Sequence, residues 1–327
     1  MSREAVAEAI RGASRLTVIC HENPDADTLG AALALRIAAE RLGKVAEVVA
    51  ADPVPPMLAH LPGAGEVRTR PQLAPDVAVV VDGPLSRTGA VASECGEWLG
   101  RARLLNIDHH VSNDGSEVEA AWVDATAAAT CEMVAELIPD LGVEIDLDIA
   151  TVLTAGIVQD THTFSHPNAT PRTLRVAAGL LEAGAPLSAI HRRIYADKPF
   201  GTLALWGRML AGIAQRRDGR IVWSAMTLPM LAETGTDAVA SEGFIDLLAS
   251  TKAADITVLF KEVDATLTRV SVRTSARADA VAITSAFGGG GHARAAGCSI
   301  EAPLGDATKR LLDECERELD RADARGR

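Results

Sequence analysis

The run Val77-Ala78-Val79-Val80-Val81-Asp82-Gly83-Pro84 decides the fold that we expect for this 327-residue chain. Five consecutive apolar residues, four of them valines, are typical of a strand that is buried on both faces of a parallel sheet. Gly83 and Pro84 then turn the chain away from the strand. A carboxylate at Asp82, directly behind a buried strand, either caps the turn or has to be paired, hydrogen-bonded or coordinated.

Three other short segments, rich in aspartate and histidine, lie where we expect further apolar elements to end. Two follow predicted strands, and the third ends the apolar helical stretch 149–158. Ligands of open α/β sheets bind beyond the carboxyl ends of the strands, so we expect all these segments to converge on one pocket. The three are His21-Glu22-Asn23-Pro24-Asp25-Ala26-Asp27, Asn106-Ile107-Asp108-His109-His110 and Gln159-Asp160-Thr161-His162.

Such a pocket would contain carboxylates and imidazoles but no pair of thiolates, and these ligands suit Mn²⁺, Mg²⁺ or Co²⁺ better than a structural Zn²⁺. Because one carboxylate can bridge two cations through its two oxygens, Asp82 favours a two-metal site, which serves in-line hydrolysis at phosphorus. Single residues also have plain structural alternatives, such as a helix cap for Asp27 and a polar helix end for Asp160. An aspartate at a helix C-terminus opposes the helix dipole, which favours a compensating cation.

The surrounding pattern predicts an α/β protein with a doubly wound, mostly parallel sheet in residues 1–185, because predicted strands alternate with helices. Residues 186–201 contain prolines and glycines and are interpreted as a connector. Residues 202–327 are expected to form a smaller α/β domain. The predicted strands of the first domain are 15–20, 45–50, 77–82, 103–108 and 119–124, and its predicted helices are 28–42, 126–139, 146–160 and 170–183.

The second domain begins with a hairpin of strands 213–215 and 221–225, predicted from the Asp218-Gly219 turn. The run Gly288-Gly289-Gly290-Gly291-His292 allows close approach of a ligand to backbone N–H groups, or is a flexible loop. Lys261 and Arg269 flank another predicted hairpin and are expected to face solvent. The other elements expected here are strands 255–262, 266–273 and 297–301 and helices 278–286 and 304–319, with a charged tail from Arg317 that frays.

Composition limits the classes of function. The formal net charge of −12 argues against a protein that tracks long duplex nucleic acid, although it leaves small anionic substrates open. Five scattered cysteines without CxxC spacing predict neither disulfides nor a zinc site and favour reduced thiols in the cytoplasm. Without an apolar run of about 18 residues or a signal pattern, no membrane partner is expected.

The four segments together resemble the DHH phosphoesterase superfamily, which is named for the tripeptide found here at Asp108-His109-His110. The glycine run before His292, with Ala295-Ala296-Gly297, is similar to the signature of the DHHA1 domain. Together they resemble the branch of oligoribonucleases (nanoRNases), pAp phosphatases and cyclic-di-AMP/pApA phosphodiesterases. The resemblance implies a metal-dependent phosphodiesterase that cleaves short 5′-phosphorylated oligonucleotides such as pApA to mononucleotides, with pAp and cyclic di-AMP as further substrates. It favours two Mn²⁺ ions and a homodimer.

The resemblance also implies roles for individual residues. One metal would be held by His21, Asp25 and Asp82, and the second by Asp27, Asp82, His109 and Asp160. The catalytic residues would include His110, in contact with the scissile phosphate, and Asp108, which supports the site. The substrate would be bound by Arg87, Arg273, Gly290, Gly291 and His292.

Two features depart from the family's pattern. Many relatives have Asp-Thr-Gly-Ser-Phe where this chain has Asp160-Thr161-His162-Thr163-Phe164, so we expect His162 to narrow or retune the cleft. Gly83-Pro84 replaces the small hydroxyl residues that usually follow the aspartate of the second segment. A family II-like inorganic pyrophosphatase shares the N-terminal ligand set and is an alternative. A non-catalytic nucleotide-binding sensor on the same scaffold is the alternative from another class.

Overall fold

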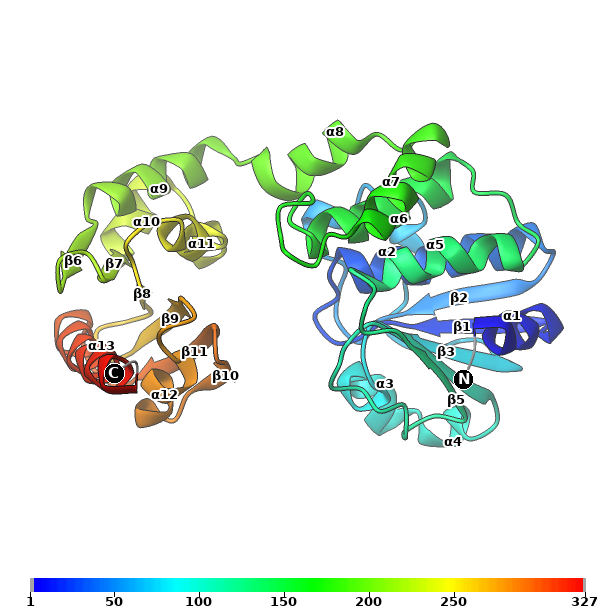
Figure 1. Cartoon of the computed structure of the whole chain (residues 1–327), viewed down its shortest axis with the longest axis horizontal. Coiled ribbons are helices and arrows are strands. Elements are labelled where there is room, and N and C mark those ends of the chain that lie inside the picture. Colours follow the sequence, from blue (N-terminus) through cyan, green and yellow to red (C-terminus); the bar gives the residue numbers. More distant parts are fainter. Residues whose placement is uncertain (1–2, 326–327) are drawn as a thin grey trace. The chain divides into compact units, whose positions relative to one another are not determined.

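The computed structural model describes residues 3–325 and divides into two compact units that meet between Asp197 and Lys198. The division falls within the predicted connector 186–201. Helix α8 (Leu187–His191) and a π-helical turn precede it, and helix α9 (Phe200–Ala211) begins just after it (Figure 1). Each unit contains one sheet with helices packed against it, so the predicted α/β class is confirmed.

The sheet of the first unit has five parallel strands in the order β2-β1-β3-β4-β5. The chain leaves β1 for β2 on one side and reaches β3 on the other side, so the strand order reverses between β1 and β3. In open sheets this reversal point is where ligands bind. The strands are β1 (Arg15–Ile19), β2 (Val45–Val49), β3 (Val77–Val81), β4 (Arg103–Asp108) and β5 (Ala120–Val123), close to the predicted ranges.

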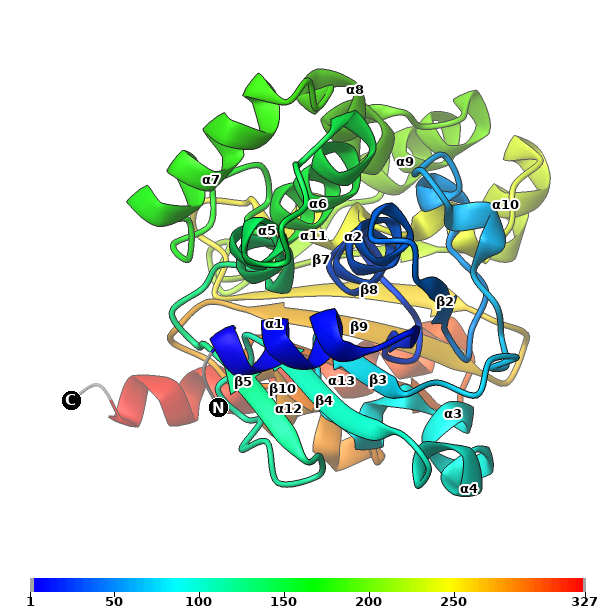
Figure 2. The ribbon, with the colours of Figure 1, turned by 90° about the vertical axis from the view of Figure 1, so that its right-hand side faces the viewer.

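Helices cover both faces of this sheet, as predicted for a doubly wound fold (Figure 2). Helix α2 is buried continuously from Ala26 to Ala39, because it packs between the sheet and helix α6. A helix that is apolar all round has to be enclosed in this way. One face carries α1 (Arg3–Gly12), α2 (Ala26–Arg41), α5 (Thr130–Asp140), α6 (Leu147–Asp160) and α7 (Pro171–Glu182), and the other carries the short α3 (Ala90–Glu94) and α4 (Gly96–Leu99).

The second unit has a six-stranded sheet in the order β10-β11-β9-β8-β7-β6, in which only β7 and β8 pair in parallel. The hairpin predicted at Asp218-Gly219 is confirmed by the antiparallel pairing of β6 with β7. The glycine run is not a loop over its whole length, because its last residues, Gly290–His292, form the edge strand β10. The strands are β6 (Ala214–Arg216), β7 (Ile221–Met226), β8 (Ile256–Glu262), β9 (Thr268–Thr274), β10 (Gly290–His292) and β11 (Ala295–Ile300).

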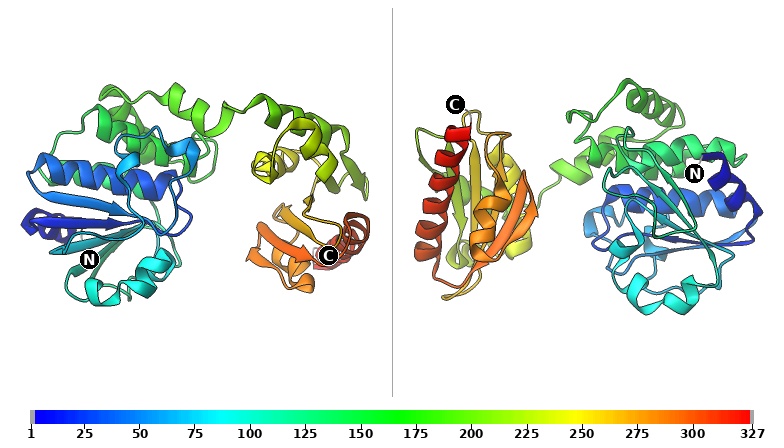
Figure 3. Two further views of the ribbon diagram at one scale, coloured as in Figure 1. Left: turned by 180° about the vertical axis from the view of Figure 1, so that it is seen from behind. Right: turned by 60° about the horizontal axis from the view of Figure 1, so that its bottom comes forward.

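Helices lie on both faces of the second sheet (Figure 3). Helices α12 (Ala280–Thr284) and α13 (Leu304–Arg325) pack on one face, and α9, α10 (Leu228–Thr234) and α11 (Phe244–Ala249) pack on the other. The prediction that the tail frays from Arg317 is wrong up to Arg325, because Arg321 and Arg325 pair with the buried carboxylates of Glu314 and Glu318. The tail beyond Arg325 lies outside the described residues. None of the described helices is long and apolar enough to cross a membrane.

Candidate metal centre

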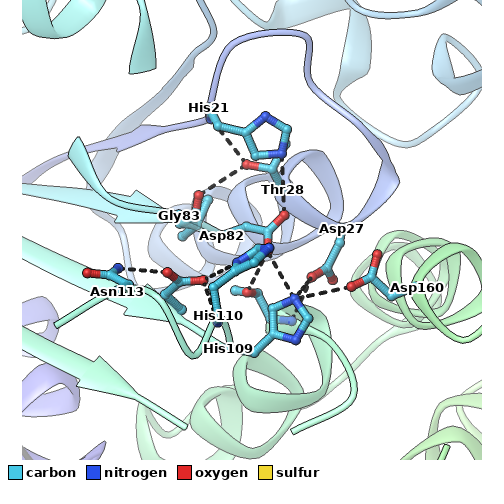
Figure 4. Close-up of polar contacts among 12 residues, drawn as sticks. His21, Asp27, Thr28, Asp82, Gly83, His109, His110, Asn113 and Asp160 are labelled. Atoms are coloured by element: carbon cyan, nitrogen blue, oxygen red, sulfur yellow. Dashed lines mark hydrogen bonds and ion pairs between the residues drawn. The ribbon is translucent and has the colours of Figure 1, made fainter. Parts of the chain in front are cut away.

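The predicted metal ligands converge at the carboxyl ends of the strands of the first unit (Figure 4). Three of them follow strands directly or within two residues, and each of these strands ends at the reversal point or beside it. The other three lie at the ends of two helices. The ligands are His21 after β1, Asp82 after β3, His109 after β4, Asp25 and Asp27 at the start of α2, and Asp160 at the end of α6.

Asp82 lies at the centre of the cluster in a left-handed backbone conformation, with φ of 62°. This conformation is uncommon for a residue other than glycine, and such residues concentrate at functional sites. Its Oδ2 lies 3.4 Å from Nε2 of His21, and its Oδ1 lies 3.5 Å from Nε2 of His109. The Thr130 hydroxyl donates a hydrogen bond of 3.0 Å to Oδ1. The two carboxylate oxygens therefore face different imidazoles.

The other ligands fall into two groups on either side of Asp82. In the first, Nε2 of His21 lies 3.6 Å from Oδ1 of Asp25. In the second, Nε2 of His109 lies 3.2 Å from Oδ2 of Asp160 and 3.9 Å from Oδ2 of Asp27. The potential ligand atoms within each group lie within 4.8 Å of one another, which is close enough to hold one ion.

The hydrogen bonds of the two histidines fit a metal. Nδ1 of His21 donates to the Glu22 carbonyl at 2.7 Å, and Nδ1 of His109 donates to the Ala127 carbonyl at 3.3 Å. In each neutral ring the lone pair of Nε2 then faces carboxylate oxygens, which is repulsive unless a cation or a proton lies between them. Nε2 of His109 is buried, and within residues 3–325 no group meets it with hydrogen-bond geometry, although Oδ2 of Asp160 lies 3.2 Å away; this is expected of a metal-ligand atom.

Protons take the place of cations when the ligands stand alone. Burial lowers the pKa of His21, but the Asp25 and Asp82 carboxylates outweigh it and raise the pKa to about 10. Burial likewise lowers the pKa of His109, and Asp160 and Asp82 raise it to about 9. Burial, together with the neighbouring carboxylates, raises the pKa of Asp27 well above its usual value. The cluster therefore needs positive charge, which divalent cations would supply.

Asp27 is held in place by the first turn of a second helix. Its Oδ2 accepts a hydrogen bond of 2.6 Å from the Thr130 amide, and its Oδ1 accepts one of 2.8 Å from the Cys131 amide. Asp25 caps α2 by accepting hydrogen bonds from the Asp27 and Thr28 amides. Both carboxylates therefore lie at helix N-termini, where the helix dipole favours negative charge.

Asp108 and His110 form a buried network beside the ligands. Oδ1 of Asp108, which is fully buried, accepts a hydrogen bond of 2.7 Å from Nδ1 of His110, and Oδ2 accepts one of 2.7 Å from Asn113. Asn113 also donates to Asn106, whose amide donates to the Val80 and Gly83 carbonyls. The His110 side chain remains 38% exposed, so its Nε2 is available to a ligand.

Sequence reasoning missed three polar residues that support the cluster. Asn106 and Asn113 orient Asp108, and Thr130 donates to Asp82. The one signal for them in the sequence is an asparagine at position 106 inside an otherwise apolar strand. A buried amide there requires a partner, which the sequence alone does not identify.

Two predicted residues border the cluster. Arg87 is exposed, and no ion pair of its guanidinium occurs within residues 3–325. His162 is exposed in the left-handed region, with φ of 46°, and its ring stacks on His166 with centroids 5.2 Å apart. It also contacts the Tyr195 ring at 4.5 Å. The His162 ring therefore packs against an imidazole and a phenol.

The predicted substrate-binding residues of the second unit lie side by side on the β9-β11-β10 edge of its sheet. The pairing register aligns Arg273 with Ala295, and Ala295 with His292, so all three share one face. Nε of Arg273 lies 3.0 Å from Oδ1 of Asp246. Gly291 has φ of 141°, and a Cβ atom there would meet the Ala295 carbonyl oxygen at 2.5 Å, whereas a Cβ atom at Gly290 would meet open space.

Comparisons with known proteins agree with this geometry. The family model described as "DHH family, N-terminal domain" matches residues 15–157, and the DHHA1 domain model matches residues 219–320. The bifunctional oligoribonuclease and PAP phosphatase NrnA of Thermus thermophilus is 32% identical over 97% of this chain and 93% of its own length. The protein of the same name from Bacillus subtilis is 27% identical over 66% of this chain and 67% of its own length.

Among solved structures, an exopolyphosphatase-related protein from Bacteroides fragilis superposes with a TM-score of 0.87 at 20% sequence identity. The superposition covers 98% of this chain and 97% of that chain, and it confirms the fold. The similarity to the Thermus protein extends through both units and includes the segments that carry the cluster. The chain therefore belongs to the DHH/DHHA1 phosphoesterase family, within its branch of oligoribonucleases and pAp phosphatases, and is a hydrolase.

Proposed function

We propose that this enzyme hydrolyses short 5′-phosphorylated oligonucleotides, including linear dinucleotides such as pApA, to 5′-mononucleotides, and that pAp and cyclic di-AMP are further substrates. The observation that carries the proposal is the position of Asp82 between two groups of ligands. The names of the Thermus and Bacillus relatives, an oligoribonuclease and PAP phosphatase, support the substrate class.

We assign two divalent cations to this cluster. His21, Asp25 and Oδ2 of Asp82 would hold one ion, and Asp27, His109, Asp160 and Oδ1 of Asp82 would hold the other. When bound, the ions would activate water and neutralise charge on the phosphate. Mn²⁺ is our first choice, because carboxylate and imidazole ligands without thiolates suit it.

The remaining residues position the substrate. Oδ1 of Asp108 accepts a hydrogen bond from Nδ1 of His110, which orients the ring and leaves Nε2 for the substrate. That nitrogen would donate to a non-bridging oxygen of the scissile phosphate once the ring is protonated, and Asp108 raises the pKa of His110 in support of the charged form. Arg87 would add a second cationic contact in this unit, and Arg273, Gly290, Gly291 and His292 would bind another part of the substrate in the second unit.

We further propose a homodimer in the cytoplasm, acting on neither membranes nor long duplex nucleic acid. All five cysteines are free thiols, as suits a reducing compartment. The net charge of −12 would repel a long polyanion. Size-exclusion chromatography with light scattering tests the dimer, for which the family resemblance is the support.

The test is hydrolysis of pApA, longer oligoadenylates, pAp, cyclic di-AMP and pyrophosphate, each with Mn²⁺, Mg²⁺ or EDTA. We expect Mn²⁺-dependent release of AMP from pApA and weak action on pyrophosphate. Strong and exclusive hydrolysis of pyrophosphate would favour the pyrophosphatase alternative. Tight nucleotide binding without turnover of any substrate would favour the sensor. Neither alternative is favoured by the similarity to an oligoribonuclease over almost the whole chain.

A further inference from the structure

A pair of positive charges occupies an unfavourable place in the sheet of the second unit. The register of the antiparallel strands β8 and β9 places Lys261 directly opposite Arg269 on one face. Like charges at directly opposed positions destabilise a sheet. Lys261 is also partly buried, which adds a desolvation cost for its ammonium group. Arg269 is exposed, as predicted, whereas Lys261 is only partly exposed.

Within the described part of the chain, neither Lys261 nor Arg269 has an acidic group within 4 Å, although Arg273 on the same strand is paired with Asp246. Two glutamates lie nearby. Glu262 accepts a hydrogen bond from the Leu228 amide, and Glu242 affects Lys261 only at longer range. Burial lowers the pKa of Lys261, and so do the guanidinium groups of Arg269 and Arg273, whereas Glu242 acts in the opposite direction.

Lys261 and Arg269 line a cavity of about 850 Å³ that lies entirely within the second unit, and the two glutamates, Glu242 and Glu262, line it too. The apolar part of the lining includes residues of α10 and of the segment after it, where Val239 is 64% exposed and Leu228 is 41% exposed. The backbone of Gly288, Gly289 and Gly290 forms the rim. The lining therefore combines two cations that form no ion pair within residues 3–325, two glutamates, apolar side chains and glycine backbone. A nucleotide would fit it with its phosphate at the two cations and its flat, weakly polar base against the apolar side chains.

We propose that this cavity binds one nucleotide unit of an oligonucleotide, with its phosphate at Lys261 and Arg269 and its base against Leu231 and Val239. The proposal rests on the proposed function and extends it to substrates longer than a dinucleotide. Arg269 precedes Arg273 by four residues on β9, which is about 13 Å at the rise of an antiparallel strand. The cavity would therefore hold the nucleotide next to the one assigned to Arg273 and His292, with Gly290 between the two.

The test compares the affinities of full-length protein variants, in Mn²⁺ buffer, for oligoadenylates of two to six nucleotides with slowly hydrolysed phosphorothioate linkages. Calorimetric titration measures binding without requiring turnover. The variant is Lys261→Ala/Arg269→Ala. The matched control is Lys252→Ala/Arg277→Ala, which removes two positive charges from exposed positions in the same unit. AMP is titrated in parallel to distinguish a free nucleotide from part of a chain.

We expect the double variant to bind oligonucleotides of four to six nucleotides about tenfold more weakly or worse, and to bind the dinucleotide within about twofold of the parent. The control should bind every length like the parent. The thermal midpoint of the double variant should not fall, because the change removes a like-charge pair. Charge-keeping Arg269→Lys should retain most of the affinity for the longer chains.

Three results would overturn the proposal. The first is equal binding of long oligonucleotides by the parent and the double variant. The second is an equal loss of affinity at every length including two, which would merge this cavity with the site of Arg273. The third is a loss of AMP binding without any dependence on chain length, which would assign the cavity to a free nucleotide. An enzyme that binds as expected but hydrolyses no oligonucleotide would refute the proposed function and leave the binding result readable.

Discussion

The carboxylate cluster of the first unit and the Lys261–Arg269 pair of the second unit, here called the cationic face, hold their charges in opposite ways. Asp27, Asp82 and Asp108 are buried, and each accepts a hydrogen bond from the backbone or from a neighbouring side chain. Lys261 is partly exposed and Arg269 is exposed, and in the part of the chain that the structure describes neither side chain has a hydrogen bond or an ion pair. The cluster is thus organised before any ion arrives, whereas the cationic face would gain its partners from the substrate.

The difference indicates how each region should respond to mutation. A preorganised centre loses its activity when one carboxylate oxygen is replaced, because no other group can take the position of that oxygen. An exposed cationic face should lose affinity in steps, because each side chain contributes a separate contact.

The largest effect is expected for Asp82→Asn. Asparagine keeps the shape of the side chain and tolerates the left-handed backbone, but it cannot offer an anionic oxygen to each ion. We expect kcat on pApA to fall by about a thousandfold or more, because metal stabilisation of the transition state amounts to several kcal/mol. Asp148→Asn, at an exposed position on α6, is the control and should behave like the parent. Retention of more than about a tenth of the activity would contradict the central place of Asp82.

A smaller effect is expected for Asn113→Ala. The change removes the amide that holds Asp108, so His110 loses its fixed orientation while every metal ligand remains. We expect kcat to fall by about 10–100-fold, with the metal content unchanged. Steady-state kinetics and metal analysis of the same sample separate the two quantities. A loss of bound metal equal to the loss of activity would argue against a role through His110.

Two adjacent glycines should behave differently. Gly291→Ala forces a side chain into the Ala295 carbonyl at positive φ, so we expect the free energy of unfolding of the second unit to fall by about 1–3 kcal/mol. Gly290→Ala meets open space and should leave stability unchanged while raising KM, because the methyl group would lie between the backbone and the substrate. Thermal unfolding and kinetics distinguish the two cases. An unchanged KM for Gly290→Ala would remove Gly290 from the substrate site.

The smallest effect concerns pH. The folded-state pKa values of His21, about 10, and His109, about 9, exceed the ordinary value of 6.5. Their contribution to stability is therefore full below about pH 6.5 and is lost as the pH rises toward 10. In EDTA we expect the thermal midpoint to fall by several degrees between pH 7 and pH 10, when it is measured at steps of about one pH unit. Protein saturated with Mn²⁺ should show a smaller fall, and a rising midpoint in EDTA would contradict these assignments.

The sequence was sufficient for the parts of the fold that have strong local signals. The valine run of β3 and the aspartate and histidine segments predicted both the parallel sheet and the edge at which the ligands meet. The edge strand Gly290–His292 was missed, because glycine has low strand propensity and its pairing with β11 is a tertiary contact. Helix α13 continues past Arg317 because Arg321 pairs with Glu314 and Glu318, and Arg325 pairs with Glu318. Both glutamates are buried, so this arrangement depends on the sheet against which the helix packs.

The candidate site shows the same limit. The residues that would ligate the ions occur in recognisable segments, and the structure brings them together. Asn113 and Thr130 occur in unremarkable surroundings, and their importance arises from contacts with Asp108 and Asp82 that are distant in the chain or depend on the loop conformation. The like-charge pair of Lys261 and Arg269 appears only once the register of β8 and β9 is known.

The most direct test of the central claim is the number of Mn²⁺ ions bound per chain, measured by calorimetric titration of EDTA-stripped protein and of Asp82→Asn. We expect two ions for the parent and at most one for the variant, because Oδ2 of Asp82 faces His21 and its Oδ1 faces His109. Binding of a single ion by both proteins would contradict a two-cation centre bridged by Asp82.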